Sequence, residues 1–154
     1  MRTVFIAVTC LAADACAASA PDYRVGALNG SWRKFDVEGN DIAFKHKDGG
    51  TIFANRMCQS DEDVPLDVLT NHLFFDMKIE REISRKEITI AGRAALRTHV
   101  IAKLDGVPVE LDIVVLKKNG CTYDMALVAD REAFQQRSPD FESFLRGFDR
   151  VGQG

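Results

Sequence analysis

Hydrophobic and polar residues alternate between Arg93 and Leu104. A period of two is typical of a strand with one buried face, so this segment predicts a long β-strand. The side chains on the predicted buried face are Ala94, Leu96, Thr98, Val100, Ala102 and Leu104. The opposite face carries Arg93, Arg97, His99 and Lys103. We expect the apolar face to pack in the core and the charged face to meet solvent.

Asp105 and Gly106 follow this strand and predict a two-residue hairpin turn, because a type I′ turn needs positive φ at both central positions. The turn pairs Leu104 with Val107 and thereby fixes the register of the whole hairpin. On the apolar face, the predicted pairs are Ala102 with Val109, Val100 with Leu111, Thr98 with Ile113 and Leu96 with Val115. On the other face, they are His99 with Asp112 and Arg97 with Val114.

A second turn is expected at Lys118–Gly120, as a three-residue loop that pairs Lys117 with Cys121. The pairs that follow are Val115 with Tyr123, Val114 with Asp124, Ile113 with Met125 and Leu111 with Leu127. A two-residue Asn-Gly turn is the alternative. It would place Asp124 against the buried Val115, which costs desolvation of the carboxylate. The three-residue loop is therefore preferred.

Further strands are expected before this hairpin. The segments Asp41–Lys47 and Thr51–Cys58 predict a hairpin around an Asp-Gly turn, with Phe44 against Phe53. The segment Glu87–Ile90 predicts a short strand that leads into the long one through an Ala-Gly bend. The predicted sheet is therefore an antiparallel meander extended by a second hairpin.

A first helix is predicted by apolar residues at helical spacing between Leu66 and Met77. The segment Ser60–Asp63 precedes them, and its acidic residues at 61–63 suit a helix N-terminus, where the helix dipole favours negative charge. Pro65 suits the first turn, because its missing N–H would have no partner there. We expect this helix to end near Glu80.

A second helical region is predicted from Asp130 onward. Its aromatic and aliphatic stripe consists of Phe134, Phe141, Phe144, Leu145 and Phe148. Ser138 and Pro139 are expected to divide it into two pieces, with Ser138 as a new N-cap, because proline disfavours helical backbone in the residue before it. Gly147 lies near the predicted end.

The first twenty residues differ from the rest of the chain. Arg2 is followed by a short apolar stretch, Thr3–Ala13, and then by small residues up to Ala20. A charged start, an apolar stretch too short to span a bilayer and a small-residue end are typical of a signal peptide. An N-terminal strand or tail is the alternative. We expect residues 1–20 to be a signal peptide and the mature protein to be periplasmic or associated with the outer envelope of a bacterium.

The mode of cleavage stays open. The segment Ala13–Cys16 resembles a bacterial lipobox, in which Cys16 would be lipidated and become the N-terminus. It departs from that pattern because Ala13 stands in place of the usual leucine. Ordinary cleavage after Ala17 or Ala20 is the alternative.

Either mode leaves Cys58 and Cys121 as the two cysteines of the folded domain. Two cysteines in an exported chain favour a disulfide. Two separate buried thiols are the alternative. A metal site is not expected, since neither cysteine belongs to a CxxC-type pair.

The composition describes one globular domain: 154 residues, of which 46% are hydrophobic. A net charge of −3 argues against a nucleic-acid or anionic-membrane surface. No cofactor motif is present either, because the glycines at 39, 49 and 50 are turn residues rather than a phosphate loop.

Three motifs resemble the PsbP-like family, which includes DcrB-type bacterial envelope proteins. They are Ile88–Ala95, Gly120–Asp124 and the closing aromatic stripe, and the similarity spans most of Phe35–Phe148. The resemblance implies an α+β fold, an α-β-α sandwich with a central antiparallel meander sheet. It implies mostly non-enzymatic roles in binding, assembly or stabilisation of partners, and no shared catalytic residues. The expected organisation is a signal peptide at 1–20, an irregular segment at 21–36 and a PsbP-like domain at 37–150.

Candidate chemistry is sparse. His99 with Asp112 could act as a base and its orienting carboxylate, but a cross-strand ion pair on an exposed face is the simpler interpretation. The acidic residues at 61–63 and Asp67 lack the alternating oxygen ligands of a calcium loop, so we interpret them as helix-capping groups. We expect neither catalytic residues nor a metal or cofactor.

The leading hypothesis is a non-catalytic exported envelope protein that acts as a binding or assembly module for protein partners. One alternative is a carrier of a small apolar ligand held between sheet and helix. The other is a hydrolytic enzyme that uses His99 and Asp112. A deep cleft around His99 would favour the enzyme, and an apolar cavity would favour the carrier.

Overall fold

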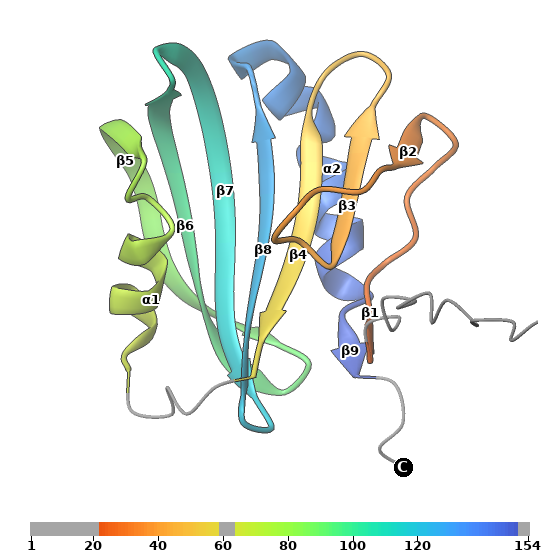
Figure 1. Cartoon of the computed structure of the whole chain (residues 1–154), viewed down its shortest axis with the longest axis vertical. Coiled ribbons are helices and arrows are strands. Elements are labelled where there is room, and N and C mark those ends of the chain that lie inside the picture. Colours follow the sequence, from red (N-terminus) through yellow and green to blue (C-terminus); the bar gives the residue numbers. More distant parts are fainter. Residues whose placement is uncertain (1–21, 59–63, 151–154) are drawn as a thin grey trace, which may run out of the picture.

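The computed structural model describes residues 22–58 and 64–150 (Figure 1). The predicted signal peptide, the lipidation candidate Cys16 and the acidic residues at 61–63 lie outside the described residues. The strands are β1 (Tyr23–Arg24), β2 (Trp32–Lys34), β3 (Ile42–His46), β4 (Thr51–Met57), β5 (Met77–Ile90), β6 (Arg93–Leu104), β7 (Val107–Lys118), β8 (Cys121–Ala129) and β9 (Asp149–Arg150). The helices are α1 (Leu66–His72) and α2 (Arg131–Arg146).

The architecture is the expected α-β-α sandwich. Seven antiparallel strands form one sheet in the order β2-β3-β4-β8-β7-β6-β5, and β1 pairs with β9 in a two-stranded ribbon. Helix α1 packs on β6 and β7 from one face, and α2 packs on β7 and β8 from the other. In Figure 1, α1 lies in front of the sheet and α2 behind it.

The β6–β7 hairpin has the predicted register. Leu104 lies opposite Val107, and every other predicted pair of this hairpin is also present. Asp105 and Gly106 have φ values of 49° and 81°, as a type I′ turn requires. Alternation and turn chemistry point to the same register here.

The predicted three-residue loop between β7 and β8 is wrong. Lys118 lies opposite Cys121, so the turn has two residues, and both Asn119 and Gly120 have positive φ. Asp124 is therefore paired with Val115 and not with Val114. The preference of Asn119-Gly120 for a two-residue turn outweighs the cost of desolvating the Asp124 carboxylate, and Asp124 is buried as a result.

The β3–β4 hairpin is also shifted by one residue from the prediction. Phe44 lies opposite Ile52, while Phe53 lies opposite Ala43, so the two aromatic rings do not meet. The His46 backbone N–H donates to the Gly50 carbonyl at 2.9 Å, which leaves a loop of three residues instead of an Asp-Gly pair. Phe44 instead meets Phe144 of α2, with ring centroids 6.5 Å apart.

Helix α1 is shorter than predicted, because the helix ends at His72 and strand β5 begins at Met77. Strand β5 is an edge strand that pairs with β6 along almost its whole length, with irregularities near Ile79 and Ser84. Pairing satisfies the backbone N–H and C=O groups of β6 that would otherwise lack partners. Exposed charged side chains suit such an edge, since they oppose pairing with other chains.

Helix α2 is one continuous helix, so the predicted break at Pro139 is wrong. Asp130 is the N-cap, as expected, and its carboxylate accepts from the backbone N–H groups of Glu132 and Ala133. Ser138 does not begin a new helix, because its hydroxyl donates to the Phe134 carbonyl at 2.8 Å. Buried aromatic side chains on both sides of the proline hold the two halves against the sheet.

Both faces of the sheet are covered, as the PsbP-like resemblance implied, whereas the alternation of Arg93–Leu104 alone predicted one solvent face. The α2 face buries a large cluster that includes Tyr123, Met125, Phe141 and Phe144. The α1 face buries a smaller one that includes Phe74, Val100, Leu111, Ile113 and Ala126. The face that carries Arg97 and His99 is the α2 face.

Candidate functional site

The polar residues of β6 and β7 form a network beneath α2. Arg97 Nε lies 3.0 Å from each carboxylate oxygen of Asp112, and Arg97 Nη2 lies 2.6 Å from Asp112 Oδ2. The same Nη2 lies 2.6 Å from Glu142 Oε1 on α2. Burial alone would lower the pKa of Arg97, but its hydrogen bonds to Asp112 and Glu142 raise that pKa above the ordinary value. The network joins the sheet to α2.

His99 does not pair with Asp112 through its side chain, although the two residues are opposite each other in register. Its Nε2 lies 2.7 Å from Glu110 Oε1. Its ring stacks on Phe134 of α2, with centroids 4.8 Å apart and an interplanar angle of 15°. The expected exposed His99–Asp112 ladder is therefore wrong. Asp112 is 6% exposed, and its carboxylate accepts hydrogen bonds from Arg97 instead of from His99.

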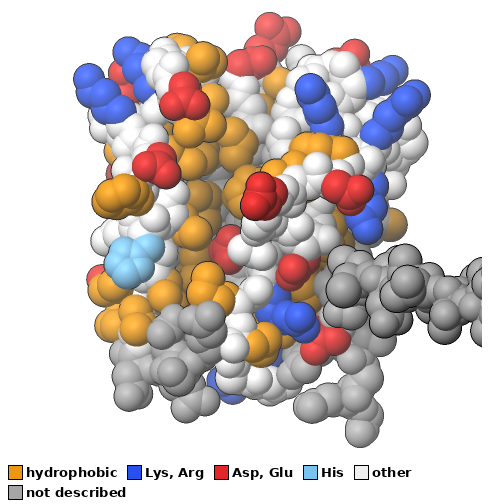
Figure 2. Space-filling model, in the orientation of Figure 1, with side chains coloured by type: hydrophobic (Ala, Val, Ile, Leu, Met, Phe, Trp, Pro, Cys, Tyr) orange, Lys and Arg blue, Asp and Glu red, His pale blue; other side chains and the backbone are white. Residues whose placement is uncertain are grey.

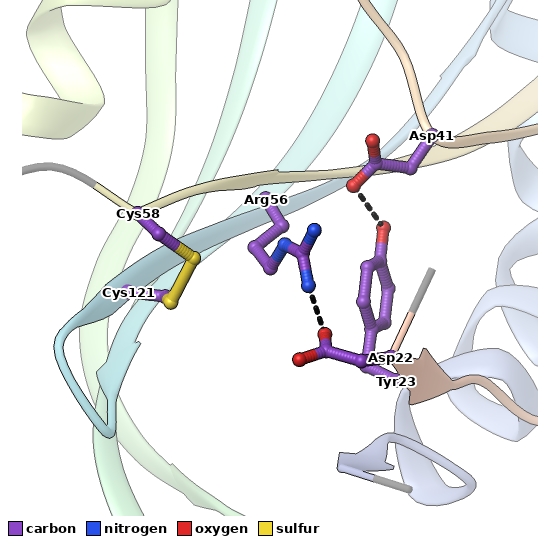
Figure 3. The surroundings of a disulfide bond; sticks show 6 residues. All are labelled: Asp22, Tyr23, Asp41, Arg56, Cys58 and Cys121. Carbon is purple, nitrogen blue, oxygen red and sulfur yellow. Dashed lines mark hydrogen bonds and ion pairs between the residues drawn. A yellow bond between two sulfur atoms is a disulfide. The ribbon is translucent and has the colours of Figure 1, made fainter. Parts of the chain in front are cut away.

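The expected disulfide between Cys58 and Cys121 is present, with an S–S distance of 2.08 Å and a Cα–Cα distance of 4.1 Å. It joins Cys58, the residue directly after β4, to the first residue of β8 (Figure 3). Around it, Arg56 is paired with Asp22. The Tyr23 hydroxyl donates to Asp41 Oδ2 at 3.2 Å. Burial and then the charge of Asp41 raise the pKa of Tyr23 above its ordinary value.

The front face of the sheet holds a site that the sequence did not predict. Because α1 packs on β6 and β7, the part of this face over β8 and β4 is hollowed (Figure 2). A cavity of about 70 Å³ lies there, between α1 and the sheet. Its lining consists of Phe53, Leu73, Met77, Leu111, Ile113, Ala126 and Asp124. We call it the Asp124 hollow.

Asp124 is the one charged residue in this lining. The residue is 8% exposed. Burial and then the charge of Asp41 raise its pKa from 3.8 to about 6, while a hydrogen bond with its own backbone N–H acts in the opposite direction. In residues 22–58 and 64–150, no ion pair involves Asp124. A perturbed carboxyl in an apolar hollow is a functional-site candidate.

Two general features bear on the class of site. In the described part of the chain, no three His, Cys, Asp or Glu side chains are grouped so that they could hold a metal ion. No helix among those residues is long and apolar enough to cross a membrane. The Asp124 hollow is the candidate site because it combines a cavity with a buried carboxyl, whereas the contacts of Arg97 and His99 link the sheet to α2.

Comparisons with known proteins identify the fold. No protein-family model and no curated protein matches the sequence. Cyanobacterial PsbP (CyanoP) from Synechocystis superposes with a TM-score of 0.60 at 12% identity, over 84% of this chain and 87% of that one. A protein of unknown function from Pseudomonas aeruginosa gives 0.56 at 16% identity, over 82% and 87%. A Bacteroides thetaiotaomicron protein gives 0.59 at 9% identity, over 88% of this chain and 50% of that one. The fold of this chain is therefore PsbP-like.

Proposed function

We propose that this protein is a non-catalytic, exported binding module of the bacterial cell envelope, and that it binds a protein partner through its front face. The observation that carries the proposal is the hollowed face between α1 and the sheet, with its apolar lining and one buried carboxyl. Exposed apolar side chains adjoin it. Phe75 is 89% exposed in the turn after α1, two residues from Leu73 of the lining. Large exposed apolar groups beside a concave surface are typical of interaction sites.

Export is supported by two features that are independent of each other. The first is the charged, apolar and small-residue order of residues 1–20. The second is the Cys58–Cys121 disulfide, because disulfides persist mainly in oxidising compartments. The periplasm or the outer envelope is the compartment that we propose.

A non-catalytic role is supported by the arrangement beneath α2. The carboxylate of Asp112 is bound by Arg97, and His99 is held between Glu110 and Phe134. Hydrolysis through His99 and Asp112 would require both side chains to leave these contacts. The PsbP-like resemblance also favours binding or assembly roles.

The proposal is tested by photocrosslinking in the organism that encodes the chain. A photoreactive phenylalanine analogue replaces Phe75 in the full-length protein, and the matched control carries it at Gln135, an exposed position on α2. We expect a protein adduct from position 75 and none from 135. Mass spectrometry of the adduct should show that the N-terminal segment has been removed, with the new N-terminus at Cys16 or directly after Ala17 or Ala20.

Two outcomes would contradict the proposal. One is an equal adduct yield from the two positions, which would indicate unspecific collision. The other is an adduct that retains Met1 and is found in the cytosolic fraction, which would contradict export.

A further inference from the structure

The Asp124 hollow lacks a positive charge. Six of its seven lining residues are apolar, and the seventh is the buried carboxyl. A buried carboxylate without a counter-ion is costly, because desolvation is not compensated by an opposite charge. A ligand that brings a cation would therefore gain the interaction that the folded chain itself does not supply.

The groups around Asp124 also favour a cation. Asp41 is the neighbouring charged group whose field acts on Asp124, and it is negative. On the adjacent strands, Asn55 of β4 and Val115 of β7 lie opposite Asp124, and both side chains are uncharged. The nearby cation Arg56 is paired with Asp22.

The size of the hollow limits the ligand. An apolar cavity of roughly 150 Å³ holds a benzene molecule, so a cavity of about 70 Å³ holds a chain of roughly three or four non-hydrogen atoms. A primary ammonium group on a short alkyl chain fits this volume, and its three N–H groups can donate to a carboxylate. A quaternary ammonium ion is bulkier and has no N–H to donate.

We infer that the Asp124 hollow binds a short primary alkylammonium ion, with the ammonium group on Asp124 and the alkyl chain against Leu73 and Met77. This site goes beyond the proposed protein partner, and its test uses the purified protein alone. Failure of the crosslinking experiment and failure of this site can therefore be told apart.

The test is a titration of the disulfide-bonded mature protein with n-propylammonium chloride, followed by amide NMR at pH 7.5. We expect saturable shifts for Phe53, Asp124 and Ala126. The neutral isostere n-propanol should bind at least tenfold more weakly. Asp124→Asn should weaken binding of the ammonium ion at least tenfold, whereas Glu132→Gln, on α2, should leave the affinity unchanged.

The pH dependence is a second readout that needs no variant. Between pH 7.5 and pH 5, Asp124 takes up a proton, whereas a primary amine stays protonated, so affinity should fall about tenfold for a carboxyl pKa of about 6. Equal affinity for n-propanol, or an unchanged affinity of Asp124→Asn, would overturn the inference. Tighter binding of Nα-acetyl-lysine amide than of n-propylammonium would also overturn it, in favour of a lysine side chain from a protein partner.

Discussion

Replacement of Gly147 by alanine is expected to destabilise the protein by about 4 kcal/mol or more, at the upper end of single substitutions. A Cβ atom at Gly147 would lie inside the contact distance of the Gly26 backbone, and a Cβ at Gly26 would collide with the Ser143 carbonyl. The two segments cross this closely because the Gly26 N–H donates to the Phe144 carbonyl at 2.9 Å.

Separating these backbones would have consequences beyond one hydrogen bond. Strand β1 would move away from β9, and Tyr23 would leave its contact with Phe148, where the ring centroids are 5.9 Å apart. Urea unfolding of Gly147→Ala and Gly26→Ala measures the loss. The matched control is Gly30→Ala, because a Cβ there meets nothing within 4 Å and the change should stay within about 0.5 kcal/mol. Similar stabilities for all three variants would contradict the close crossing.

Loss of the Cys58–Cys121 disulfide is expected to have a similar effect. The cysteines are separated by 63 positions in the sequence. In the chain-entropy model, opening a loop of this length costs about 4 kcal/mol, because the unfolded chain regains conformational freedom. The double variant Cys58→Ser/Cys121→Ser should lose this amount relative to the oxidised wild type in urea unfolding.

Reduced wild type serves as the control for this comparison, since it keeps both sulfur atoms in place. Its stability should agree with that of the double variant within about 1 kcal/mol, which would assign the loss to the crosslink rather than to packing. Two reactive thiols in the unfolded, unreduced wild type would show instead that the bridge does not form.

The sequence predicted the β6–β7 hairpin correctly because two signals agree there. Alternation assigns the apolar face, and Asp105-Gly106 sets the register. At the next turn these signals conflict. Strand β8 is covered on both faces, with Tyr123 and Met125 toward α2 and Ala126 toward α1. Because apolar residues lie on both faces of β8, the hydrophobic pattern does not specify the register of this strand. The Asn-Gly turn specifies it instead.

The errors around α1 and β5 have a related cause. Leucines at 66, 69 and 73 fit a helix, and Met77 continues their spacing, although it is the first residue of β5. The charged residues that follow are good helix formers, so local propensity did not reveal an edge strand. Strand β5 forms because β6 needs a pairing partner, and this constraint cannot be read from the local sequence of residues 77–90 alone.

The Asp124 hollow was not predicted from the sequence, because the burial of Asp124 was treated as a cost to be avoided. The sequence does predict that a two-residue turn would bury Asp124 beside Val115, and the cost of that burial was used to reject the turn. Local rules are violated most often at functional sites, where a cost in stability is retained. The sequence feature that indicates the site is therefore Asp124, a carboxylate within the largely apolar strand β8.

The most direct test of the Asp124 site is the unfolding free energy of wild type and of Asp124→Asn, measured in urea at pH 4 and at pH 7.5. Because the folded-state pKa of about 6 lies above the unfolded value of 3.8, the folded protein holds this proton more tightly. The stability that this proton contributes is therefore full below pH 3.8, still large at pH 4, and lost as pH rises through about 6. We expect wild type to lose about 2–3 kcal/mol relative to Asp124→Asn between the two pH values. An equal pH dependence of the two proteins would contradict a buried Asp124 carboxylate without a counter-ion.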